Sequence, residues 1–123
     1  IGEKTLKRVY SYDINDRLLE SIDYQIDGAE ETAVRYTEYQ YDRRGQTTGY
    51  AELSQENEPT ADEIKAHQIR YHYDSDGKLT KVTYPTTKNG VHALSYEYDQ
   101  NGRLTKTVTT DHKNDDKNRI LYL

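Results

Sequence analysis

A short pattern, Tyr-x-Tyr-Asp-x-x-Gly, occurs four times along the chain. Its Tyr-Asp pairs are Tyr12-Asp13, Tyr41-Asp42, Tyr73-Asp74 and Tyr98-Asp99, and they are separated by 29, 32 and 25 residues. Recurrence of one unit at such intervals is typical of a repeat architecture, in which one supersecondary element is used several times. The pattern therefore constrains the fold class more tightly than the function.

Each copy of the pattern predicts a β-hairpin. In the third copy Ile69, Tyr71 and Tyr73 alternate with polar residues, which is the period of a strand with one buried face. Asp74 suits the first position of a type I turn, because its carboxylate accepts a backbone N–H two residues on. Gly77 suits the positive φ that follows, and residues 78–84 form the returning strand.

The other copies supply equivalent turn residues, with two departures. Asp16 stands where the other copies have glycine, and aspartate tolerates the left-handed region at some cost. Thr47 replaces the leucine that follows the other turns, so we expect the second hairpin to be the loosest packed. The predicted turn residues are Asp13, Asp16, Asp42, Gly45, Asp74, Gly77, Asp99 and Gly102.

The register of the hairpins is left open by the sequence. One register places Tyr73 opposite Leu79, and the other places Tyr71 opposite Val82, which suits the third copy better. The fourth copy favours the first register, with Tyr98 opposite Leu104 and Leu94 opposite Val108. A slip of one residue would exchange the two faces of a strand.

The connectors between the hairpins also carry turn signals. Asp27-Gly28 and Asn89-Gly90 are strong hairpin dipeptides, and residues 111–118 form a polar stretch before a last strand at 119–123. We therefore expect an all-β protein, an antiparallel meander of about eight strands, folded as a curled single sheet or partial barrel. It would be a single domain over residues 1–123, with units near 6–26, 34–53, 69–84 and 92–110.

Residues 54–68 break the pattern and form an insertion between the second and third units. Thr60 and Glu63 have the spacing of a capping box, which predicts a short helix near 60–67. Only Ile64 and a neighbouring alanine would be buried, so a mobile loop is the alternative.

The composition limits the core. The 123 residues contain no Phe, Trp, Met or Cys, and Ile, Leu and Val together number only 21. A net charge of only −5, with both signs interspersed, and 13 tyrosines at strand spacing argue for a folded chain over a disordered one. No run of 18 apolar residues is present, so we expect no membrane insertion of this segment, and the mildly acidic surface disfavours nucleic acid.

The paired tyrosines of the four copies admit two interpretations. In a chain without Phe or Trp they would supply the core; if one row faces solvent, they would form an aromatic platform for a sugar or a protein. The residues of this candidate binding platform are Tyr10, Tyr12, Tyr39, Tyr41, Tyr71, Tyr73, Tyr96 and Tyr98.

The sequence carries no catalytic or metal-binding motif that we recognise. His67, His72, His92 and His112 lack the local spacing of zinc ligands, and no Ser lies in a nucleophile elbow. The Asp-x-Asp-Gly turn lacks the further ligands of a calcium loop, and Asp111, Asp115 and Asp116 would make at most a weak calcium site. We expect no enzymatic activity, no metal and no cofactor.

The four Tyr-Asp units with the following Gly45-Gln46, Gly77-Lys78 and Gly102-Arg103-Leu104 resemble the bacterial YD repeat, also called the Rhs repeat. The resemblance covers about residues 6–110, without the insertion. It implies a β-rich bacterial protein that is secreted or part of the cell envelope. In large members the repeats form a shell around a toxic cargo, which four units are too few to build.

The function expected from the sequence is therefore a non-enzymatic structural or interaction module of a secreted or cell-envelope bacterial protein. A protein or a cell-surface glycan would be its partner. The alternatives are a glycan-binding module that uses an exposed tyrosine row and a fragment of a larger Rhs-type toxin shell. The chain starts with Ile1, which we interpret as the mark of a processed or trimmed piece.

Overall fold

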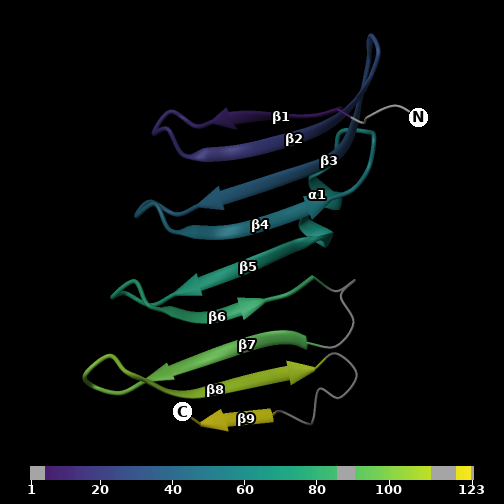
Figure 1. The fold of residues 1–123 in the computed structure, drawn as a ribbon. Helices are drawn as coiled ribbons and strands as arrows, with labels where there is room; N and C mark the ends of the chain where they lie inside the picture. The colour runs from purple at the N-terminus through teal and green to yellow at the C-terminus, as the bar shows by residue number, and fades with distance from the viewer. Residues whose placement is uncertain (1–4, 86–90, 112–118, 123) are drawn as a thin grey trace. The chain divides into compact units, whose positions relative to one another are not determined.

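The computed structural model describes residues 5–85, 91–111 and 119–122, and Figure 1 labels their elements. Nine strands and one helix occur in these residues. They are β1 (Thr5–Tyr12), β2 (Leu18–Asp27), β3 (Glu30–Tyr41), β4 (Thr47–Leu53), α1 (Ala61–Ala66), β5 (Gln68–Tyr73), β6 (Leu79–Thr83), β7 (Val91–Tyr98), β8 (Leu104–Asp111) and β9 (Arg119–Tyr122). The all-β prediction is confirmed, with nine strands in place of about eight.

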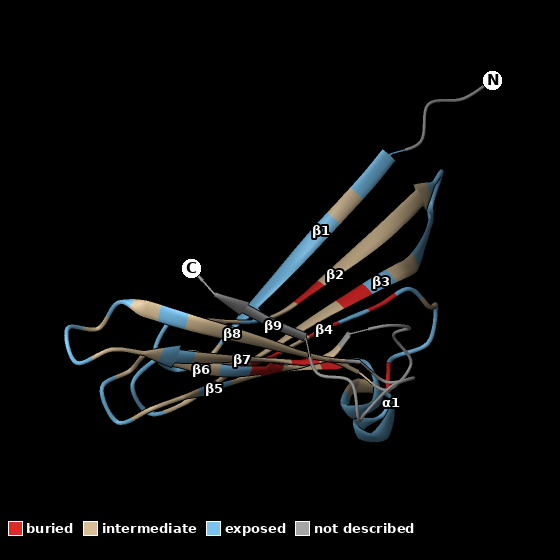
Figure 2. Cartoon of the chain, turned by 90° about the horizontal axis from the view of Figure 1, so that it is seen from below, coloured by how far each residue is buried: buried red, intermediate tan, exposed pale blue. Residues whose placement is uncertain are grey.

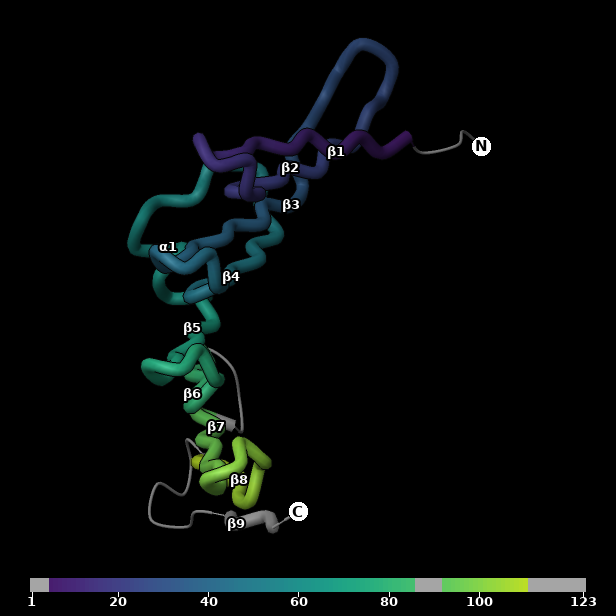
Figure 3. The backbone as a smooth tube through the Cα atoms, turned by 90° about the vertical axis from the view of Figure 1, so that its left-hand side faces the viewer, coloured from purple at the N-terminus to yellow at the C-terminus, as the bar shows by residue number. Residues whose placement is uncertain are grey.

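The chain divides into two compact units, residues 1–68 and 69–123, which we call unit 1 and unit 2. In unit 1, strands β1 to β4 follow one another in chain order as antiparallel neighbours, and Figure 3 traces this path along the backbone. In unit 2, β5 to β9 do the same. Each hairpin of the predicted meander is therefore present.

Neither unit closes on itself. Among the described strands the order in each unit is linear, and the first strand does not pair with the last. The predicted curled sheet or partial barrel is therefore corrected to an open meander. Each described strand pairs with its chain neighbours within its unit, and no pairing between the first and last described strand of a unit closes the sheet into a barrel.

The insertion forms the short helix α1 and not a mobile loop. Thr60 is its N-cap: the Thr60 hydroxyl accepts from the Glu63 backbone N–H at 3.1 Å, and the Glu63 carboxylate accepts from the Thr60 N–H at 2.9 Å. This reciprocal pair is the capping box predicted from the spacing. The helix contacts β4.

The most deeply buried residues of unit 1 lie on β3 and β4. Ala51 and Leu53 are 1% and 2% exposed, and Tyr36, which is directly opposite Leu53, is 6% exposed. The Tyr36 hydroxyl donates to the Glu56 carbonyl at 3.2 Å, so the segment before α1 lies against this core. The expectation that the second hairpin is the loosest packed is therefore wrong, because the insertion covers it.

In unit 2 the buried apolar residues are Val82 and Ala93, which lie on neighbouring strands. By contrast, β1 in unit 1 is exposed over nearly its whole length, as Figure 2 shows. Two sequence predictions, the Asn89-Gly90 turn and the polar stretch from His112 to Asn118, lie outside the described residues. That the chain is a single domain stays a prediction, and within it the structure has the two compact units.

Candidate functional site

The four Tyr-Asp turns have the same hydrogen bonding. In each, one carboxylate oxygen of the aspartate accepts the backbone N–H groups of the residues two and four positions later, at 2.8–3.0 Å. The aspartate N–H also donates to the carbonyl four residues on. The left-handed position is taken by Gly45, Gly77 and Gly102 at φ 84°, 85° and 81° and by Asp16 at φ 62°. The aspartate of each motif is thus a turn residue whose carboxylate is hydrogen-bonded to the backbone of its own turn.

The carboxylates of Asp13 and Asp99 are stabilised in their charged form. The pKa of each is lowered, first by the hydrogen bond from the backbone N–H of the residue four positions on, Arg17 or Arg103. Each arginine also donates its Nε to the second carboxylate oxygen, at 2.7 Å for Arg17 and 2.9 Å for Arg103. These aspartates therefore serve the turns as anions.

A β-bulge directly after each turn resolves the register. Tyr73 lies opposite Leu79, yet Tyr71 lies opposite Val82, because Thr80 has no counterpart on β5. Both registers allowed by the sequence are thus present, on either side of the bulge. The Thr80 hydroxyl donates to the carbonyl of His72 at 3.2 Å, and so satisfies a carbonyl beside the irregularity.

The fourth hairpin repeats this arrangement. Tyr98 lies opposite Leu104 as predicted, but Leu94 lies opposite Thr109 and not Val108. The prediction for Leu94 is wrong because it does not allow for the extra residue, Thr105, whose hydroxyl donates to the Glu97 carbonyl at 3.1 Å.

In unit 1 the second tyrosine of the motif joins one hairpin to the preceding one. The Tyr41 hydroxyl donates to the Leu18 carbonyl at 2.6 Å, across from β3 to β2. The Arg17 guanidinium lies 4.9 Å from the Tyr41 ring centroid and donates Nη1 to the Asp42 carbonyl at 3.1 Å. Burial raises the pKa of Tyr41, as expected for a hydroxyl enclosed by this arrangement. We call this set of contacts a clasp.

Unit 2 contains a second clasp. The Tyr98 hydroxyl donates to the Leu79 carbonyl at 2.6 Å, and the Lys78 ammonium lies 5.5 Å from the Tyr98 ring centroid. Lys78 also lies against Gly102, where an added Cβ would stand 2.7 Å from the Lys78 Nζ. In both clasps the tyrosine hydroxyl donates to the carbonyl of the leucine that follows the turn of the preceding motif copy. The basic residue just before that leucine covers the tyrosine ring.

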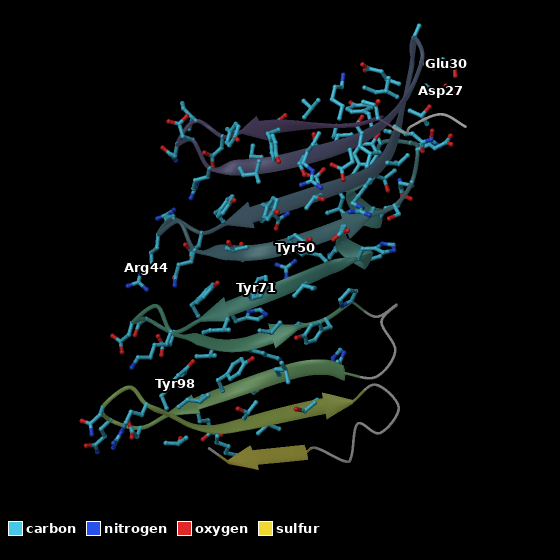
Figure 4. The ribbon with its side chains drawn as sticks, in the orientation of Figure 1. Asp27, Glu30, Arg44, Tyr50, Tyr71 and Tyr98 are labelled. Atoms are coloured by element: carbon cyan, nitrogen blue, oxygen red, sulfur yellow. The ribbon has the colours of Figure 1, made fainter. Side chains whose placement is uncertain are left out.

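The eight motif tyrosines are not equivalent in exposure. Tyr10 and Tyr12 on β1 are 49% and 58% exposed, whereas the other six are half-buried or, for Tyr41 and Tyr98, held in clasps. The ring of Tyr39 packs edge-on against Tyr50 on β4 at 5.3 Å. Figure 4 labels Tyr50, Tyr71 and Tyr98 among the side chains. Whether these residues bind a ligand stays a prediction, and the exposed part of the row is confined to β1.

A hollow with a volume of about 220 Å³ lies along β1 and is lined by Leu6, Lys7, Arg8, Tyr10 and Asp23. Its charges are paired within the sheet. Arg8 donates Nε to Asp23 at 2.5 Å and Nη2 to the same carboxylate at 3.1 Å, and Lys7 lies 2.7 Å from Glu31. The hydrogen bonds that Arg8 donates to Asp23 raise the pKa of Arg8 most, hydrogen bonding with Tyr10 raises it next, and Arg8 in turn lowers the pKa of Asp23.

These ion pairs continue across unit 1. Arg35 on β3 lies 3.9 Å from Asp23 and 3.3 Å from Glu52 on β4. One row of alternating charges therefore crosses the face that carries the motif tyrosines, because Arg8, Asp23 and Arg35 are directly opposite one another in the register. A neighbouring Tyr50 hydroxyl donates to Glu52 at 2.9 Å.

The opposite face holds two carboxyl groups side by side. Glu20 and Glu38 are partners in the β2–β3 register, and both are half-buried. Burial, followed by hydrogen bonding with Glu20, raises the pKa of Glu38 to about 8. The neighbouring carboxyl group of Glu20 therefore adds to burial in disfavouring the charged form of Glu38.

Within the residues that the structure describes, no group of three His, Asp or Glu side chains lies where it could hold a metal ion. The Asp115 and Asp116 of the weak calcium hypothesis lie outside that part of the chain. The described part also contains no helix that is long and apolar enough to span a membrane.

Sequence reasoning missed two sets of residues. The first set is Arg17 and Lys78, each directly after a turn; the rings that they cover, Tyr41 and Tyr98, are the second tyrosines of the next copy of the motif. Tyr36, the buried tyrosine, lies outside the motif and carries no local signal. The recurrence of a basic residue after the turn in three of four copies was the available sign of the first set.

The comparison with protein families agrees with the repeat. The RHS Repeat family model matches residues 73–113. The solved structures similar to this chain include a DUF3836 family protein from Parabacteroides distasonis, 14% identical, with 98% of this chain and 92% of that chain covered and a TM-score of 0.35. They also include a protein of unknown function from Bacteroides fragilis, 11% identical, with 96% and 89% covered and a TM-score of 0.36. No curated protein matches the sequence.

Proposed function

We propose that this RHS-repeat chain is a non-enzymatic structural or interaction module of a secreted or cell-envelope bacterial protein. The observation that carries the proposal is the clasp. The aspartate of each motif is held in its turn, and the second tyrosine of two copies, Tyr41 and Tyr98, is held in a clasp. Residues that hold a scaffold in this way are not free for acid–base or nucleophilic chemistry.

The exposed edge supports an interaction role. The hollow along β1 combines apolar side chains with an ion pair, and large exposed apolar patches usually mark binding surfaces. The location outside the cytoplasm is the expectation that the repeat resemblance brings to this chain. The absence of cysteine is compatible with any compartment.

A protease-protection experiment on intact source cells tests the location. Cells treated with proteinase K and probed with an antibody against this chain would lose the signal, while a cytoplasmic marker would persist. If the chain is fully protected until the cells are lysed and is absent from the medium and the periplasm, the proposed location is wrong.

Glycan binding is the second candidate function, favoured by the exposure of Tyr10 and Tyr12 on one face of β1. Aromatic rings at such a place stack on the apolar faces of sugars. A glycan array with the full chain, compared with Tyr10→Ala and Tyr12→Ala variants, tests it. The matched control is Tyr39→Ala, since Tyr39 packs against Tyr50 within the sheet. An array without hits ends this candidate.

A further inference from the structure

Every large apolar side chain that is exposed in the described part of the chain belongs to the first hairpin. These side chains are Leu6 (70% exposed), Val9 (41%), Tyr10 (49%), Tyr12 (58%), Ile14 (97%) and Leu19 (39%). Four of them lie on β1, which pairs with β2 and with no other described strand. A strand with one unpaired edge and apolar side chains is a template for pairing with another strand.

The two cations of β1 do not protect this edge. Lysine and arginine on an edge strand usually prevent pairing by charge repulsion. Here the charge of Lys7 is bound by Glu31 at 2.7 Å, and that of Arg8 is bound by Asp23 through two hydrogen bonds. The charges that would repel a second edge are therefore neutralised within unit 1 before any partner arrives.

The order of side chains on β1 is self-complementary. Leu6, Arg8, Tyr10 and Tyr12 share one face, because successive residues of a strand alternate in direction. In an antiparallel pair of two β1 strands with Val9 on a two-fold axis, Leu6 lies opposite Tyr12 of the second copy, and Arg8 lies opposite Tyr10. The pairs are thus apolar with aromatic and cation with aromatic, both favourable across strands.

Other registers fit less well. The two sheets keep the same face up whenever a residue of β1 lies on the axis, and the axes near the middle of the strand are at Arg8, Val9 and Tyr10. An axis at Arg8 would place two guanidinium groups opposite each other. An axis at Tyr10 would bring in Ile14, which lies in the turn beyond the end of β1. The axis at Val9 uses residues 6–12, all within the strand.

We propose that the β1 edge is a homodimerisation surface, on which the β1 strand of a second copy of this chain pairs antiparallel about Val9. The aromatic rings of the second copy then cover the hollow lined by Leu6, Arg8 and Tyr10. The interface is isologous, since the same patch is used by both copies. This proposal does not depend on the location of the protein.

Sedimentation of the full chain over a concentration series tests the pairing. We expect a reversible monomer–dimer equilibrium. Val9→Lys places two ammonium groups opposite each other at the axis and raises the dissociation constant by about tenfold or more. Ile14→Lys is the matched control, because Ile14 is 97% exposed and lies outside the paired residues. It leaves the constant unchanged.

Cysteine cross-linking tests the register, and the chain has no native cysteine to interfere. Oxidised Val9→Cys forms a covalent dimer, because residues directly opposite on antiparallel strands are close enough for a disulfide. A mixture of Leu6→Cys and Tyr12→Cys cross-links to the heterodimer, while Ile14→Cys does not cross-link.

Any of three outcomes overturns the proposal. The first is sedimentation as a monomer at every concentration. The second is a dimer that Val9→Lys leaves as tight as before, and the third is cross-linking of Ile14→Cys as fast as that of Val9→Cys. Circular dichroism spectra matching the parent chain show that each variant retains its strands, so that a lost dimer reports the interface and not unfolding.

Discussion

The two clasps share one hydrogen bond and differ in the cation. In both, a tyrosine hydroxyl donates to a leucine carbonyl at 2.6 Å. In unit 1 Arg17 covers the ring and also binds the Asp13 carboxylate and the Asp42 carbonyl. In unit 2 Lys78 covers the ring and lies against Gly102. The hydroxyl bond is therefore common to both clasps, and the cation differs because a ring face accepts either a guanidinium or an ammonium group.

The two units differ more strongly in the cross-strand pair that lies two residues after the leucine of each clasp. In unit 1 this pair is Glu20 with Glu38, while in unit 2 it is Lys81 with Ser95. The same repeat thus tolerates a carboxyl pair in one unit and none in the other. The backbone register sets this position, and the side chains at it are free to give each unit its own dependence on pH.

The largest effect concerns the cores. Leu53→Ala should destabilise unit 1 by about 3 kcal/mol, because a buried leucine loses its packing and leaves a cavity. Val82→Ala in unit 2 removes fewer atoms and should cost about 2 kcal/mol. Hydrogen exchange measured separately on residues of each unit checks both. If Leu53→Ala leaves exchange in unit 1 unchanged, the insertion does not close a core there.

The next largest effect is a difference between the two units in how their stability depends on pH. The pKa of Glu38 in the folded protein, about 8, lies above its ordinary value of 4.5, so the folded state keeps a proton that the unfolded chain releases. The stability of unit 1 should therefore be highest below that ordinary value and fall as the pH rises towards about 8. We expect a loss on the order of 2 kcal/mol, less than the full shift implies because Glu38 is only half-buried.

Glu38→Gln should remove this loss, since an amide has no charge to repel Glu20. Denaturation monitored by hydrogen exchange at several pH values checks it, and unit 2, with Lys81 and Ser95 at this place, is the internal control. A variant that keeps the full pH dependence of the parent would contradict the role of the carboxyl pair.

Equal losses are expected from the two clasp hydroxyls. Tyr41→Phe and Tyr98→Phe each remove a donor and leave a leucine carbonyl without it, at a cost of about 1 kcal/mol. Tyr12→Phe is the matched control, because Tyr12 is 58% exposed on β1. Urea denaturation of the three variants compares them. Losses at Tyr41 and Tyr98 no greater than at Tyr12 would show that the clasp hydrogen bonds do not stabilise the fold, and unequal losses at the two would show that the clasps are not equivalent.

The smallest effect concerns the first turn. Asp16 adopts φ 62° where unit 2 has Gly77 at 85°. Asp16→Gly should therefore stabilise unit 1 by about 0.5 kcal/mol, because glycine takes the left-handed conformation without a Cβ penalty. The thermal unfolding midpoint should rise slightly, whereas Gly77→Asp should lower it. A lower midpoint for Asp16→Gly would show that the aspartate side chain has its own role in the turn.

The sequence by itself determined the local structure. Asp at the start of each turn, glycine at the left-handed position and the Thr60–Glu63 pair before α1 each act over four or five residues. Interactions of this range are set by residue type and spacing alone. They are enough to predict the four hairpins and to indicate the short helix, for which the sequence alone leaves a mobile loop as the alternative.

Only the tertiary structure decided which residues far apart in the sequence contact each other. The bulge at Thr80 reconciled two registers, Tyr41 reached Leu18 across 23 residues, and Tyr36 became buried under the insertion. The open edge at β1 and the pairing of Glu20 with Glu38 arose in the same way. Such contacts depend on which strand lies beside which and in what register, and a pattern of alternating residues is compatible with more than one answer.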